Sequence, residues 1–156
     1  MLVGAAVVVA IVAAGCGGDD GTTRQDAVAA RGATVMPFDQ DRTVHHFVAN
    51  DAGGVEMVVA KDAKDTAQIS LVREHLKMEA ERFAKGDFSD PAAIHGEDMP
   101  GLGALKAGAS RMTIRYSDVK DGGQIDYSST DAVLVAAIHD WFNAQTSDHG
   151  SHAMSN

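Results

Sequence analysis

Apolar and polar residues alternate over two neighbouring stretches of the chain, 42–50 and 55–60, and the first is rich in β-branched residues. The sequence Asp-Ala-Gly-Gly at 51–54 separates them, which predicts a β-hairpin. A helix is expected next, because Asp65 is a favourable N-cap residue and apolar residues then recur at helical spacing as far as Phe83.

The same pattern recurs in the second half of the chain. Residues 111–119 and 124–128 have strand character on either side of a Gly-containing turn, and Asp131 begins a second amphipathic helix. We therefore predict an α+β fold of two tandem ββα units, in which a four-stranded antiparallel sheet carries two helices on one face. The single folded domain is expected to span residues 35–147.

A long connection at 86–101 joins the two units and contains two of the three prolines of the chain. Connections of this length are usually functional or are wrapped over the core. We therefore treat this connection as the first place to look for a site.

An apolar run at 2–15 begins the chain and stops at Cys16. The run is too short for a transmembrane helix, which needs about 20 residues, but it has the length of the apolar part of a signal peptide. The sequence Ala-Ala-Gly-Cys at 13–16 resembles the lipobox of bacterial lipoproteins. The resemblance implies that residues 1–15 are removed and that Cys16 carries a diacylglycerol anchor in a membrane. Residues 16–34 are then expected to be a flexible tether.

Composition and charge exclude some classes of function. The 156 residues include 13 Lys and Arg against 22 Asp and Glu, for a formal net charge of -9. No nucleic-acid partner is expected, because such binding needs a basic surface. The single cysteine excludes an internal disulfide and a cysteine-only zinc cluster.

Histidine and methionine carry the candidate chemistry, with seven residues of each type. Imidazole and thioether groups together favour copper as the bound metal, and zinc is the alternative. In order of preference, the expected ligands are His95, Met99, His75, His45 and His149.

Other residues are weaker candidates or have a plainer interpretation. Asp98 and Glu97 belong to the same connection as His95 and are further loop candidates. The tail at 148–156 is typical either of a short metal-binding tract or of a disordered end.

Two plain structural interpretations also stand beside the metal hypothesis. Helical spacing places His75 at the boundary between core and solvent, where a histidine is more often a packing residue than a ligand. Glu79 and Glu81 are interpreted as solvated charge. Common catalytic motifs such as G-x-S-x-G, H-E-x-x-H and C-x-x-C are absent from the sequence, so enzymatic activity is not favoured.

Several short motifs are also informative as a set. They are MPFD at 36–39, REHL at 73–76, GDFSDP at 86–91, IHGEDMPGL at 94–102, WF at 141–142 and DHG at 148–150. Together they resemble a family of small bacterial proteins that often carry the automatic name aspartate carbamoyltransferase. The resemblance covers most of the chain beyond the tether and assigns no chemistry to the motifs. The chain has no Ser-Thr-Arg-Thr loop for carbamoyl phosphate, so that activity is not predicted.

The leading hypothesis is a lipoprotein of the cell envelope, anchored to a membrane through Cys16 and facing outside the cytoplasm, that binds or sequesters copper. One alternative is a non-enzymatic lipoprotein that docks an envelope protein partner. A third hypothesis is an enzyme that acts on a small substrate at the 86–101 connection.

Overall fold

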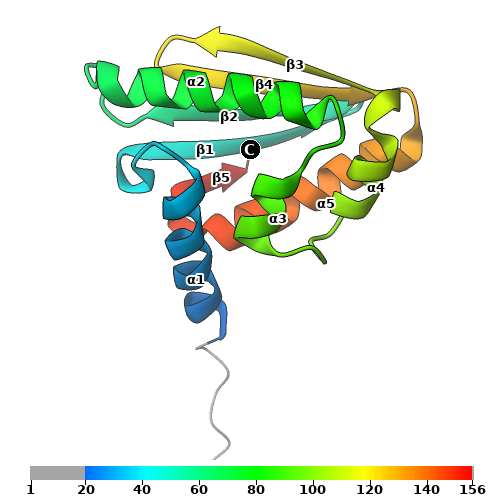
Figure 1. Ribbon diagram of the computed structural model, residues 1–156, viewed down its shortest axis with the longest axis horizontal. Coiled ribbons are helices and arrows are strands. Elements are labelled where there is room, and N and C mark those ends of the chain that lie inside the picture. Colours follow the sequence, from blue (N-terminus) through cyan, green and yellow to red (C-terminus); the bar gives the residue numbers. More distant parts are fainter. Residues whose placement is uncertain (1–19, 156) are drawn as a thin grey trace, which may run out of the picture.

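The computed structural model describes residues 20–155, which form an α+β fold of five α-helices and one five-stranded sheet (Figure 1). The helices are α1 (Asp20–Val35), α2 (Thr66–Phe83), α3 (Ser89–His95), α4 (Leu102–Gly108) and α5 (Ala132–His149). The strands are β1 (Thr43–Asn50), β2 (Gly53–Ala60), β3 (Met112–Val119), β4 (Gly122–Ser129) and β5 (Ala153–Ser155). Short 3-10 turns lie at Gln40–Arg42, Ala109–Arg111 and Gly150–His152.

The sheet is mixed, with the strand order β3-β4-β2-β1-β5. Two hairpins, β1–β2 and β3–β4, join through an antiparallel pairing of β2 with β4. Strand β5 returns along the free edge of β1 in the parallel direction, opposite His45, His46 and Phe47.

Aspartates begin both long helices, as their positions in the sequence predict. The side chain of Asp65 accepts a hydrogen bond from the backbone N–H of Gln68, and that of Asp131 accepts one from Val133. Helix α2 then packs over β3 and β4, whereas α5 packs over β1 and β2. One continuous core joins both helices to the same face of the sheet.

The predicted fold was wrong in its strand count, its sheet type and its helix count. A four-stranded antiparallel sheet with two helices was expected, whereas β5 adds a parallel edge strand and α1, α3 and α4 add three helices. Strand β5 has three residues and helices α3 and α4 have seven each, so none of them is long enough for a periodic pattern to stand out. The 86–101 connection therefore contains α3 and folds over the core.

Both ends of the expected domain also differ from the structure. Residues 20–34, assigned to a flexible tether, belong to α1, whose Val28 is buried in the core. In the 148–156 tail, Asp148 and His149 are buried and β5 joins the sheet. The expected signal peptide at 1–15 and the expected anchor residue Cys16 lie outside the described residues. No helix among residues 20–155 is long and apolar enough to cross a membrane.

Candidate functional site

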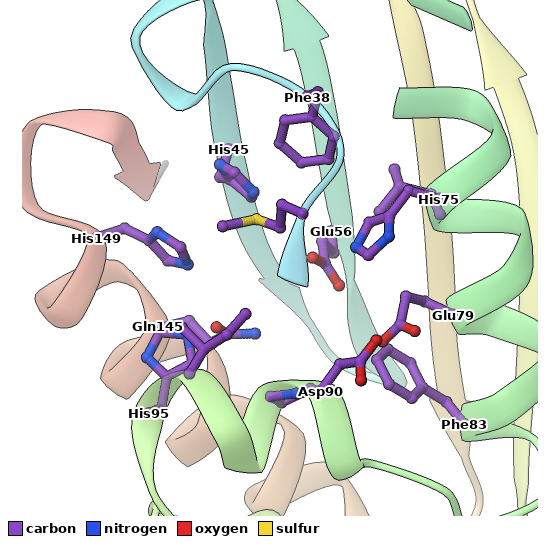
Figure 2. Close-up of a pocket in the computed structure, with 14 residues that line it drawn as sticks. Phe38, His45, Glu56, His75, Glu79, Phe83, Asp90, His95, Gln145 and His149 are labelled. Carbon is purple, nitrogen blue, oxygen red and sulfur yellow. The ribbon is translucent and has the colours of Figure 1, made fainter. Parts of the chain in front are cut away.

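A small polar pocket lies between the sheet and helices α2, α3 and α5 (Figure 2). Its volume is about 40 Å³, enough for a few water molecules or one coordinated ion rather than an organic substrate. The residues that line it are Met36, Phe38, His45, Glu56, His75, Leu76, Glu79, Phe83, Asp90, Pro91, Ile94, His95, Gln145 and His149.

Each wall of the pocket supplies two polar side chains. On the helices these pairs are spaced by four or five residues, which brings the pairs on α2 and α5 to one face of the helix. The pairs are His45 and Glu56 from β1 and β2, His75 and Glu79 from α2, Asp90 and His95 from α3, and Gln145 and His149 from α5.

Three imidazoles form a cluster on one side of the pocket. The rings of His45 and His149 stack with 4.6 Å between their centroids, and His95 meets His149 edge-on at 5.0 Å. The Nδ1 atom of His45 is buried and has no hydrogen-bond partner among the described residues. We call these three residues the imidazole cluster.

Burial keeps the histidines of the pocket neutral. Burial, together with the neighbouring histidines, lowers the pKa of His45 to about 3 and that of His149 to about 2. Burial also lowers the pKa of His75 and of His95. A neutral imidazole is the form that binds a metal ion.

An ion pair with helix α1 fixes the orientation of His95. Arg24 donates two hydrogen bonds to the carboxylate of Asp148, at 2.6 and 2.7 Å. The same carboxylate lies 2.9 Å from Nδ1 of His95. Burial alone would raise the pKa of Asp148, but the bonds from Arg24 and His95 lower it overall. Asp148 is therefore ionised and accepts a hydrogen bond from the Nδ1–H group of His95, which leaves the ring lone pair on Nε2.

Carboxyl groups occupy the opposite side of the pocket from the imidazole cluster (Figure 2). Glu56 accepts a hydrogen bond of 2.7 Å from the Tyr127 hydroxyl. Burial raises the pKa of Glu56 to about 7 and that of Glu79 to about 8. For Glu79, the nearby Asp90 adds to the rise and Arg82 opposes it.

The raised pKa of Glu79 predicts that wild-type stability falls as pH rises. The folded protein keeps a proton on this carboxyl up to about pH 8, whereas the unfolded chain releases it above the ordinary value of 4.5. Relative to Glu79→Gln, the wild-type protein should therefore lose about 1.4 kcal/mol of unfolding free energy for each pH unit across this window. Urea unfolding with a chelator, near pH 5 and near pH 7.5, measures the difference.

Glu81→Gln is the matched control for this measurement. Glu81 lies on the same helix but is exposed. The difference in unfolding free energy between wild type and Glu81→Gln should therefore be the same at both pH values. A constant difference between wild type and Glu79→Gln at both pH values would contradict the prediction.

Four of the residues proposed from the sequence meet in this pocket: His45, His75, His95 and His149. Met99 does not line the pocket, and its side chain is buried in the core from the connection between α3 and α4.

The two loop carboxylates also lie away from the pocket. Glu97 is exposed and forms an ion pair with Lys106, and Asp98 is exposed. These placements do not support Met99, Asp98 or Glu97 as ligands in this pocket.

The carboxyl groups of the pocket were missed by the sequence analysis. Glu79 was interpreted as solvated charge, yet only 3% of it is exposed. Its position one helical turn after His75 could have indicated that the two side chains share one face of the helix. Glu56, on strand β2, gave no such signal, and Asp148, which holds His95 from outside the pocket lining, was noted only as part of the 148–156 tail.

No group of three or more His, Cys, Asp or Glu side chains within residues 20–155 is arranged to hold a metal ion as it stands. The pocket instead offers neutral imidazoles and a thioether around a small space.

Comparison with known proteins gave no match. No family model, curated protein or solved structure matches the chain. Its function is therefore inferred from the pocket and the sequence.

Proposed function

We propose that this protein binds a transition-metal ion in the pocket, with His45, His95 and His149 as the principal ligands. The observation that carries the proposal is the buried imidazole cluster, in which Nδ1 of His45 has no hydrogen-bond partner within residues 20–155. Burying a ring nitrogen without a hydrogen bond is costly unless another group binds it.

The donor set favours copper over harder metal ions. The cluster supplies neutral imidazoles, and Met36 contributes a thioether to the same lining. Thioethers select Cu(I), whereas imidazole accepts either oxidation state of copper and also zinc. Zinc is therefore the second choice.

Binding requires a local rearrangement, since no three ligands converge in the described structure. The free space of about 40 Å³ lets the rings of His45 and His149 turn toward a common point. His95 needs the least adjustment, because the Asp148 carboxylate already fixes its ring through Nδ1. In many metal sites a carboxylate likewise binds the ring nitrogen that is not coordinated to the metal.

The proposal includes attachment to a membrane through Cys16. Its support is the lipobox-like sequence at 13–16, which directly follows an apolar run. Two acyl chains would hold the domain at the envelope, where a histidine and methionine site avoids the oxidation that threatens thiolates.

Metal titration of the full chain in mild detergent tests the binding. We expect elemental analysis to find about one equivalent of copper, and melting temperature to rise as Cu²⁺ is added, because a ligand at 100 times its Kd stabilises a protein by about 2.7 kcal/mol. Absence of stoichiometric copper and zinc, with an unchanged melting temperature, would refute the proposal.

His46 provides a matched control for the ligand assignment. It follows His45 on β1, so its side chain points to the other face of the sheet, and it does not line the pocket. We expect His45→Gln, His95→Gln and His149→Gln each to weaken copper binding at least about tenfold, equivalent to about 1.4 kcal/mol, and His46→Gln to leave it unchanged. Equal losses in all four variants would place the metal elsewhere.

A further inference from the structure

One residue of the pocket lining is more exposed to solvent than the others. Asp90 is the only one of the fourteen that is not buried, and 24% of its side chain is exposed. It lies in the first turn of α3, so its carboxylate marks the mouth of the pocket.

Polar donors continue inward from this mouth. The carboxyl groups of Asp90 and Glu79 point toward each other in Figure 2, and the exposed fraction of the Glu79 side chain is only 4%. Glu56 and His75 lie between these carboxyls and His45, at the deep end (Figure 2). The lining between Asp90 and His45 therefore offers a cation a series of oxygen and nitrogen donors.

Arg82 is the cation that pairs with Asp90 at the mouth of the pocket in the described structure. Its Nη1 atom lies 2.5 Å from Asp90 and 2.9 Å from Glu79. It also donates to Asp87 through Nε at 2.9 Å and to Ser89 through Nη2 at 2.6 Å. The guanidinium can therefore release Asp90 to an incoming ion and keep three other partners.

We propose that Asp90 is the capture ligand of the pocket, which takes a divalent cation from solvent in exchange for Arg82 and passes it by way of Glu79 and His75 to the imidazole cluster. This inference rests on the proposed metal-binding function and adds to it the route by which the ion arrives. Two observations support it: Asp90 is the most exposed lining residue, and the unpartnered Nδ1 of His45 marks the end of the route.

Stopped-flow measurement of Cu²⁺ uptake by the full chain in detergent tests the route, with the signal taken from Trp141 fluorescence or copper absorbance. For Asp90→Asn we expect association and dissociation both to slow by at least about tenfold, so that Kd changes little. Asp90→Glu, which keeps a carboxylate, should restore most of the rate.

Asp98→Asn is the charge-matched control. Asp98 is exposed just beyond α3 and does not line the pocket, so its loss should change association by less than about twofold through general electrostatics. Unchanged association in Asp90→Asn, or an equal slowing in Asp98→Asn, would overturn the inference. Weaker affinity at an unchanged association rate would also overturn it, since Asp90 would then be a resident ligand.

Arg82→Gln tests the same route from the opposite side and remains informative if Asp90→Asn folds poorly. Removing the competing cation should speed association by at least about threefold. Equal or slower association would contradict the exchange. If the wild-type chain takes up no copper, the proposed function itself fails, and that result precedes every rate comparison.

Discussion

Replacing Gly101 by alanine is expected to destabilise the domain by about 3 kcal/mol or more, because two costs add at this position. Gly101 has φ of +77°, a left-handed conformation that other residues adopt only at a cost. A Cβ there would also lie 2.1 Å from the backbone oxygen of Ala137 on α5. The clash is with a helix backbone, which cannot rotate away. Urea or thermal unfolding measures the loss.

Two other glycines separate the two costs. Gly96 has φ of +104° but open space around it, so Gly96→Ala should show the conformational cost alone, about 1–2 kcal/mol. Gly103 lies within α4 and also has no neighbour within 4 Å of the added Cβ, so Gly103→Ala should stabilise by up to about 1 kcal/mol. If Gly101→Ala costs no more than Gly96→Ala, α4 does not pack against α5 as described.

Replacing Trp141 by alanine is expected to cost about 4 kcal/mol, the other large effect. Trp141 is fully buried on α5, and its ring lies 5.5 to 6.0 Å from the rings of Tyr127, Phe88, Phe142 and Phe83. Truncation removes the centre of this aromatic cluster and leaves a cavity that the surrounding rings cannot fill. Chemical denaturation with near-ultraviolet circular dichroism measures both stability and aromatic packing.

Trp141→Phe is the matched variant for this prediction. The indole Nε1 of Trp141 is buried without a hydrogen-bond partner among the described residues, so phenylalanine loses ring volume but no hydrogen bond. We expect a cost of about 1–2 kcal/mol. A loss as large as that of Trp141→Ala would mean that the indole nitrogen makes a bond that matters.

These two positions also bear on the pocket. Gly101 and Trp141 set how α5 lies against α4 and the sheet, and α5 carries Gln145, Asp148 and His149 further along. Helix α5 therefore links core packing to the geometry of the imidazole cluster.

Long periodic segments of the sequence were sufficient to place most of the core. Both hairpins and helices α2 and α5 lie close to where alternation, helical spacing and the capping residues Asp65 and Asp131 put them. The complete fold was not predictable in the same way. Helix α1 has only Val28 as a fully buried apolar anchor and holds its place through polar contacts such as those of Arg24 and Arg31. A segment of that composition has the sequence pattern of a tether.

The histidines of the pocket could be proposed from the sequence because histidine is rare and chemically distinctive. Their meeting place could not, since it depends on β1, α3 and the end of α5 coming together. Asp98 and Met99 were attractive for their place in a Gly- and Pro-containing motif, but local sequence does not fix which side of a short helix faces the sheet. The carboxyl groups of the pocket were not predicted, because the sequence suggests that Glu79 is an ordinary charged surface residue. In the folded pocket, burial raises its pKa and the carboxyl keeps its proton.

Helix α1 changes how far the domain can reach from a membrane. The helix starts at Asp20, only four residues after Cys16. Fully extended, four residues span about 14 Å, whereas a tether to residue 34 would have reached several times as far. Under the proposed anchoring at Cys16, the start of α1 would stay within about 14 Å of the lipid, and the domain would sit at the membrane surface rather than on a long tether.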